Sequence, residues 1–282
     1  MRFALAVLFW LLTTVALAAT IPAGWLQCNV VDADSYAALA QQAAGDPALQ
    51  SAVADELAAR AMSLIATHGG TVPDSARVHD TAAAFTAGPS FPPLFAKANR
   101  VAHDWLFTEP RSAQNGDPWT VDVAPMLDDD SIQQMLSTYH VKVPATLTVP
   151  VTVTVPYSVH QGELSRLTTW GPWLSLAAVV VTGFLGLLTL AAARRRGKAL
   201  TSLGVSALSV GAAGWAAIEV GDRYLNNALN RTTGNIRDVA DVMVGQAKTG
   251  MHLWLNLTLI AGAVLVVLGV IVAVLGSLFK KS

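Results

Sequence analysis

Two long apolar runs, separated by a short basic stretch, set the architecture of this chain. Trp173 to Ala193 carries no charged side chain, and neither does Ala199 to Ile218. Each run is about 20 residues long, the length that a helix needs to cross a hydrocarbon core of roughly 30 Å. The stretch between the runs is long enough only for a tight turn. We therefore predict a transmembrane hairpin.

Charge is sorted along the chain and predicts which side of the membrane each segment occupies. The basic residues that flank the predicted spans on one side are Arg194, Arg195, Arg196, Lys198, Lys280 and Lys281. Lys and Arg close to membrane ends are retained in the cytoplasm. From Ile21 to Thr168, by contrast, the chain has fifteen Asp or Glu and seven Lys or Arg. We predict a multi-pass plasma-membrane protein with a cytoplasmic C-terminus and an acidic domain outside the cytoplasm.

The apolar runs divide the chain into five segments. These are an N-terminal anchor or signal sequence (1–26), an extracytoplasmic domain (27–168), the hairpin (170–221), a second outer loop (222–251), and a last span with a basic tail (252–282). The first run has Arg2 before it and Ala16-Leu17-Ala18 inside it, as a cleavable signal sequence would. Because the run extends to Leu26, it is long enough to span, and we favour an uncleaved anchor.

Helix start signals recur through the first half of the outer domain. Capping side chains predict one helix from Asp32 to Ala44, one that begins at Asp46-Pro47 and one from Asp74 to Phe85. A fourth, amphipathic helix is predicted from Pro93 to Phe107. In the second outer loop, apolar residues at helical spacing predict two short amphipathic helices between Glu219 and Met251.

The second half of the outer domain has a different pattern. Trp119 to Val123 alternates as a strand, Pro125 to Tyr139 is helical, and Val141 to Val155 is extended but interrupted by prolines. The predicted fold class is therefore an α-helical membrane protein with four transmembrane helices and a mainly α, α+β extracytoplasmic domain.

The helix from Pro93 to Phe107 carries a polar group of four residues: Asn99, Arg100, His103 and Asp104. Arg100 and Asp104 are four residues apart and can pair, as can Asn99 and His103. The group is a candidate interaction surface. The alternative is a solvated or domain-facing helix surface with a few fixed hydrogen bonds, and we favour that alternative.

Glycines recur at helical spacing in the predicted spans. The candidates for close helix packing are Gly204, Gly211, Gly262, Gly269 and Gly276. Small residues let helix backbones approach closely in lipid. The last three are seven residues apart and share one side of the final span, which could pack against the hairpin or against a second copy of the chain.

Several chemistries find no support in the sequence. The chain has a single cysteine, Cys28, which excludes a cysteine-based zinc site and an internal disulfide. The acidic run Asp128 to Asp130 lacks the ligand spacing of a calcium loop. No histidine pair has metal-ligand spacing, and no Gly-x-Ser-x-Gly or phosphate loop is present. We predict no cofactor, no metal and no nucleic-acid partner.

Three stretches resemble a family of uncharacterised four-span membrane proteins from actinobacteria, of mycobacterial type. They are Val31 to Tyr36 leading to Asp46 to Gln50, Phe91 to His103, and Val121 to Pro125. The order of elements is also similar to that family. The resemblance implies an actinobacterial plasma-membrane protein and implies no activity.

Three functions remain in competition, and the first is favoured. It is a non-enzymatic cell-envelope protein whose outer domain docks onto another membrane or cell-wall protein. The second is an oligomeric transport or permeability component, although no ionisable residue lies inside a predicted span, as proton or ion paths usually need. The third is an outer-leaflet enzyme that uses His103, Asp104, Asp122 or His140.

Overall fold

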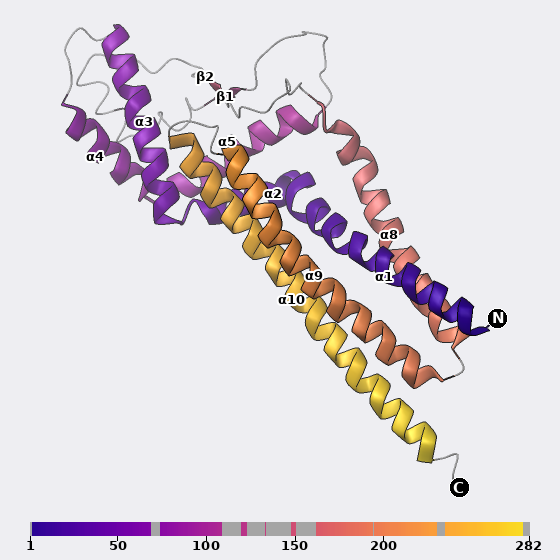
Figure 1. Cartoon of the computed structure of the whole chain (residues 1–282). Helices are drawn as coiled ribbons and strands as arrows, with labels where there is room; N and C mark the ends of the chain where they lie inside the picture. Colours follow the sequence, from indigo (N-terminus) through magenta and orange to yellow (C-terminus); the bar gives the residue numbers. More distant parts are fainter. Residues whose placement is uncertain are drawn as a thin grey trace. The chain divides into compact units, whose positions relative to one another are not determined.

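The computed structural model describes residues 2–68, 74–108, 120–122, 133, 148–150, 162–193, 195–229 and 235–278. The chain divides into two compact units. We call residues 1–28, 170–223 and 248–282 the span unit, and residues 29–169 and 224–247 the head unit. Nearly all described residues in both units are helical (Figure 1).

Among the described residues, four helices are long and apolar enough to cross a membrane, as the sequence predicts. They are α1 (Arg2–Leu26), α8 (Ser165–Ala192), α9 (Arg196–Leu229) and α10 (Asn235–Leu278). Their large apolar side chains mostly face outward: Leu187 is 66% exposed and Val264 51%. A hydrocarbon solvent accepts such surfaces, whereas water does not. The described residues therefore contain the predicted helices, which fit a multi-pass membrane protein.

The last two spans are longer than the sequence analysis predicts. Residues 222–251 do not form two separate short helices: α9 continues to Leu229, and α10 already begins at Asn235. At 1.5 Å per residue the 44 residues of α10 extend about 66 Å, roughly twice the thickness of a hydrocarbon core. The chain has no proline after Pro172 that could have ended either helix.

The first span does not end in a loop. After α1, residues Gln27–Val31 form a π-helix, and α2 (Ala33–Ala43) follows one residue later. A π-helix bonds each N–H to the carbonyl five residues earlier, so it widens the turn and changes which carbonyls are available to side chains. Asp32, between the two helices, caps α2 by accepting a hydrogen bond from the Ser35 N–H at 2.8 Å.

The head unit is built on four helices whose starts the sequence predicts. α2 is followed by α3 (Pro47–His68), α4 (Ser75–Thr86) and α5 (Phe91–Phe107). Asp46 and Asp74 each accept a hydrogen bond from a backbone N–H of the first turn, as N-caps do. The predicted helices are confirmed, and α5 begins two residues earlier than expected.

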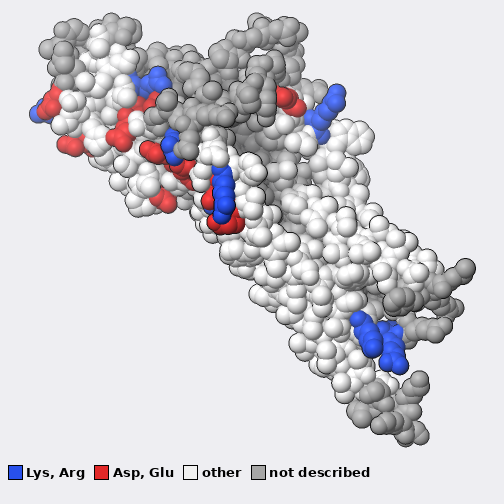
Figure 2. Space-filling view, viewed as in Figure 1, with Lys and Arg blue, Asp and Glu red and all other residues white. Residues whose placement is uncertain are grey.

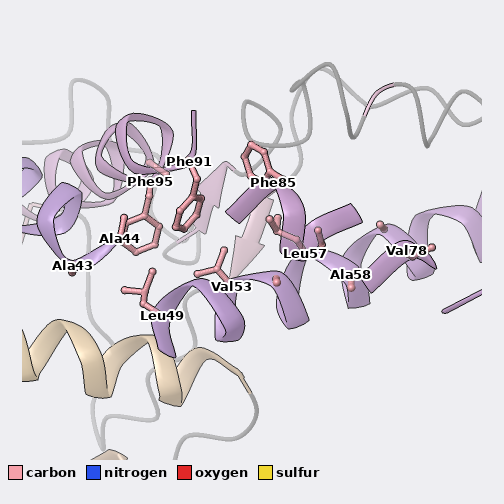
Figure 3. Close-up of a cluster of buried hydrophobic side chains, with 14 of the residues drawn as sticks. Ala43, Ala44, Leu49, Val53, Leu57, Ala58, Val78, Phe85, Phe91 and Phe95 are labelled. Carbon is pink, nitrogen blue, oxygen red and sulfur yellow. The ribbon is translucent and has the colours of Figure 1, made fainter. Parts of the chain in front are cut away.

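One apolar core holds α3, α4 and α5 of the head unit together (Figure 3). Phe91 is fully buried, and its ring lies between those of Phe85 and Phe95, with centroids 5.9 and 5.5 Å away. Alanines fill the narrow spaces between the helices, among them Ala54 on α3, which is fully buried. Val239, Val242 and Met243 at the start of α10 pack against the same core.

The α+β part of the predicted fold class is not supported. Outside the helices, the described residues contain one antiparallel ribbon, β1 (Thr120–Asp122) with β2 (Thr148–Pro150), in which Val121 pairs with Val149. Two strands of three residues each cannot form a layer of a domain. The predicted helix from Pro125 to Tyr139 lies, apart from Gln133, outside the described residues, as does most of the segment from Val141 to Val155.

Candidate functional site

The four polar residues of α5 do not form one surface. Arg100 and Asp104 are exposed, Asn99 is half-buried, and His103 is buried at 5% exposure. The Asn99 amide donates to the Phe95 carbonyl of its own helix at 2.9 Å, so it does not pair with His103. The four side chains therefore divide between the surface and the interior of the head unit.

Arg100 pairs with a different helix from the one the sequence suggests. Its guanidinium donates to the carboxylate of Asp34 on α2, and the predicted pair with Asp104 is not formed. Both partners are largely exposed, with 49% and 77% of their side chains accessible. Such pairs contribute little stability in water, so this one serves mainly to orient α2 on α5.

His103 is the most constrained of the four. Its Nε2 lies 2.8 Å from the carbonyl oxygen of Val30, in the π-helix that follows α1. Because a carbonyl only accepts, Nε2 carries the proton. The imidazole stacks on Phe107 at a centroid distance of 4.2 Å and a 9° interplanar angle. The His103 side chain therefore connects α5 to the π-helix.

The second nitrogen of His103 is buried and has no hydrogen-bond partner among the described residues. The closest carboxylate, that of Asp104, lies 3.9 Å from Nδ1, beyond hydrogen-bond range. The ring of Tyr36 lies 5.2 Å from the imidazole, and burial raises the pKa of its phenol. A general base needs reach to a substrate proton, which a side chain enclosed by Tyr36 and Phe107 does not have.

The pKa of the Asp32 carboxyl in the head unit is clearly displaced. Hydrogen bonds from the Ser35 backbone N–H and hydroxyl lower the pKa of Asp32 below its usual value, and the charge of Arg100 adds to the effect. The cause is the helix cap itself. The displacement therefore reflects capping of α2 and carries no catalytic implication.

No described part of the chain offers a metal centre. Among the described residues, no three His, Cys, Asp or Glu side chains are close enough to hold an ion. Cys28 is an exposed free thiol. The side chains of Asp122 and His140, which the enzyme hypothesis would use, and the acidic run 128–130 lie outside the described residues.

Four of the five predicted packing glycines lie at the contact of α9 with α10, where the two helices run side by side (Figure 1). A Cβ on Gly204 would lie 2.7 Å from the Gly262 carbonyl oxygen, and one on Gly262 would lie 3.0 Å from the Gly204 carbonyl oxygen. Gly197 and Gly269 oppose each other in the same way, at 2.8 Å. We call these four residues the glycine seam.

Two of the predicted packing glycines do not face a glycine of the other helix and are not part of the glycine seam. Gly211 faces the Leu259 side chain, 2.7 Å from where its Cβ would be, so it meets a flexible group. Gly276 has nothing within 4 Å among the described residues. Gly197, which the sequence analysis does not select, belongs to the seam, and its seven-residue spacing from Gly204 is the pattern that could have identified it.

Hydroxyl groups connect α1 to its neighbours in the span unit. Thr13 lies 3.3 Å from Thr189 and Thr20 lies 2.8 Å from Thr182, both on α8. Thr14 donates to Ser206 on α9 at 2.8 Å. These side chains also bond to carbonyls of their own helices; Thr13, for example, donates to the Phe9 carbonyl at 2.7 Å. Interhelical hydrogen bonds of this kind hold helices together in lipid.

A groove of about 840 Å³ lies among α1, α8, α9 and α10 within the span unit. Its lining has no charged side chain, and its surface is mostly apolar. The sequence alone does not reveal this groove, because its lining residues come from four separate helices and only their packing brings them together. A volume of this size is in the range of ligand-binding pockets.

The basic residues that predict topology lie at the turn between α8 and α9. Arg195, Arg196 and Lys198 are exposed, and Figure 2 shows a small basic group near one end of the span unit. Arg194, Lys280 and Lys281 lie outside the described residues. The side of the membrane on which this turn lies stays a prediction.

Comparison of the chain with family models, with curated proteins and with solved structures finds no match. The resemblance to actinobacterial four-span proteins therefore stays a prediction.

Proposed function

We propose that the protein is a non-enzymatic integral membrane protein of the cell envelope whose head unit docks onto a basic surface of another envelope protein. The turn at Arg195 and Arg196 would lie in the cytoplasm and the head unit outside it. The proposal rests on one observation: α2, α3 and α4, with their capping residues, carry seven carboxylates and two arginines.

The acidic surface is exposed and gathered on one unit. Figure 2 shows Asp and Glu side chains over the helices of the head unit. Asp80 on α4 has 84% of its side chain accessible, and Asp34 on α2 has 77%. Three of the seven acids cap helices. An excess of one sign steers a partner of opposite charge and suppresses wrong partners.

The geometry of α5 supports a docking function over an enzymatic one. Its histidine is enclosed, its arginine is paired with Asp34, and its asparagine is bonded to its own helix. None of these three groups is free to act on a substrate. The charge excess of the neighbouring helices therefore offers the stronger functional hypothesis.

The docking proposal is tested by site-specific photocrosslinking in native membranes. A photoreactive amino acid replaces Ala76, an exposed residue of α4, and Val101, an exposed residue of α5, serves as the matched control position. We expect a heterologous product from position 76 whose mapped contact on the partner is Lys- or Arg-rich. Asp80→Lys should weaken that product, as should high salt, which screens exposed charges.

Two results would contradict docking. Equal products from positions 76 and 101, unaffected by salt, would show that the acidic face has no preferred partner. Crosslinks between copies of the chain alone would favour the oligomeric alternative.

The proposed topology has its own test. Cys28→Ser removes the only cysteine of the chain, so that single cysteines can be introduced elsewhere. We expect a membrane-impermeant maleimide to label Asp80→Cys in intact cells and to leave Arg195→Cys unlabelled until the cells are opened. The reverse pattern would overturn the assigned orientation.

A further inference from the structure

The groove in the span unit presents hydrocarbon along most of its length. Its aliphatic lining includes Leu17 on α1, Val179 on α8 and Leu257 on α10. Six hydroxyl side chains also line it, and the protein itself supplies a hydrogen-bond partner for each: they belong to Thr13, Thr20, Ser175, Thr182, Ser206 and Thr258.

This arrangement disfavours water as the occupant. A buried water typically makes about three hydrogen bonds and needs polar partners that are not already engaged. In this groove the hydroxyl protons are committed to helix carbonyls or to one another; Ser206, for example, donates to Ser202 and accepts from Thr14. An engaged hydroxyl presents mainly its methyl or methylene surface. The lining is therefore apolar in effect as well as in composition.

The groove is elongated along the helices. Its lining residues on α1 share one face, from Thr13 through Leu17 and Ile21 to Gly24, and Cys28 of the following π-helix continues that line. The fifteen steps from Thr13 to Cys28, at about 1.5 Å each, extend about 22 Å, which exceeds the roughly 15 Å that half of a hydrocarbon core occupies. A slot of this length and direction matches an extended acyl chain.

We propose that the groove binds one acyl chain of a bilayer phospholipid, which lies along α1 between α8 and α10. The adjoining outward faces of these helices are already apolar and exposed, so the groove is continuous with a surface that lipid covers. An empty space of about 840 Å³ would cost free energy because its lining atoms would lose their dispersion contacts. The acyl chains of the surrounding bilayer are the groups available to fill this space.

The site depends on the four spans lying in a membrane and is independent of the docking proposal. Its occupant also differs from ordinary surrounding lipid. Helices enclose the bound acyl chain on several sides, so the bound lipid should exchange with the bilayer more slowly than lipid on an open helix face does. That difference makes the site measurable.

The test uses the full chain in phospholipid nanodiscs that contain a phospholipid with a diazirine in its acyl chain. After illumination, mass spectrometry locates the labelled residues. We expect groove residues such as Val179 and Leu257 to be labelled in excess over Val180 and Leu187, which are at least as exposed to lipid as Val179 but lie outside the groove. Equal labelling of both sets would overturn the proposal, because surrounding lipid alone gives that result.

Two matched pairs of variants separate occupancy from a general loss of structure. Val179→Trp and Gly186→Phe place a large ring in the groove, whereas Val180→Trp and Gly183→Phe place the same ring on the same helix outside it. We expect the first of each pair to abolish the excess labelling at Leu257 and the second to preserve it. The comparison requires that the two variants of a pair have equal thermal stability.

Two further outcomes would overturn the acyl-chain assignment. If Leu17→Cys in the Cys28→Ser background reacts with a small water-soluble thiol reagent in nanodiscs, the groove holds water. If illumination gives crosslinks from the groove to a second copy of the chain and none to lipid, a protein helix fills it.

Discussion

The head unit and the span unit are built from the same kind of helix, but they place their large side chains in opposite ways. In the head unit, Phe91 and Leu49 are fully buried and alanines line the contacts. In the span unit, Leu187 and Val264 are more than half exposed, and α9 meets α10 through glycine. Helical content alone would not distinguish the two units.

The difference shows what drives each unit to pack. In water, burying apolar area stabilises a fold, so the head unit places its phenylalanines inside. In lipid the surroundings are as apolar as leucine, so close backbone approach and hydrogen bonds hold helices together instead. The hydroxyl pairs Thr13–Thr189 and Thr20–Thr182 are hydrogen bonds of this kind between spans. Each unit can therefore be disrupted by a different kind of substitution.

The largest effect should come from emptying the core of the head unit. Phe91→Ala removes a fully buried ring between Phe85 and Phe95, and truncations of this kind cost about 3–5 kcal/mol. Native-state hydrogen exchange on the full chain should show faster opening of α3 and α4 amides. Val101→Ala, at a position that is 50% exposed, is the control and should leave exchange nearly unchanged. Equal effects would mean that this core does not stabilise the head unit.

The next effect should come from filling the glycine seam. Gly204→Leu puts a side chain where even a Cβ would lie 2.7 Å from the Gly262 backbone, and overpacking of this kind costs about 1–3 kcal/mol. The midpoint of thermal unfolding in detergent should fall. Gly276→Leu, which has open space around it, should leave the midpoint in place. If both variants unfold alike, the seam does not hold α9 and α10 together.

A smaller effect tests the contact of His103 with the π-turn. His103→Phe keeps an aromatic ring against Phe107 but removes the proton that Nε2 donates to the Val30 carbonyl. The expected cost is that of one hydrogen bond, about 0.5–1.5 kcal/mol. It should appear as faster hydrogen exchange at the start of α2. Asp104→Asn, on the exposed neighbour, is the control, and an equal response there would rule out this role of His103.

The smallest effect should appear only in acid. The pKa of Asp32 is lower in the folded state than its ordinary value of 3.8. The Asp32 cap therefore stabilises α2 fully at pH values above 3.8, and this stabilisation is lost as the pH falls through the folded-state pKa. Asp32→Asn keeps a capping side chain without a titrating group. Hydrogen-exchange protection of α2 should therefore fall on acidification in the native chain and fall less in the variant. Identical pH profiles would assign the acid response to another group.

The sequence predicts the local elements of this protein well. Run lengths identify the four spans, and the side chains of Asp32, Asp46 and Asp74 identify three helix starts, because both depend on neighbouring residues alone. The glycine spacing likewise indicates close packing, since seven residues return to the same face of a helix.

Contacts between distant elements could not be predicted in the same way. The pairing of Arg100 with Asp34 depends on how α2 lies on α5, whereas helical spacing favours Asp104. The enclosure of His103 depends on the π-turn at 27–31, for which the sequence has no recognised pattern. The groove in the span unit is a further example. By contrast, the unbroken length of α9 and α10 could have been predicted, since no proline follows Pro172.

The glycine seam also bears on register. Gly204 faces Gly262 and Gly197 faces Gly269, yet a slide of seven residues, about 10.5 Å, would set Gly204 against Gly269 and Gly211 against Gly262. Both alignments juxtapose glycines, so the glycines alone do not choose between them. In the observed alignment Gly211 receives the Leu259 side chain, a contact that the slide would replace with Gly262. The alignment of α9 along α10 therefore depends on the side chains beside the seam as well as on its glycines.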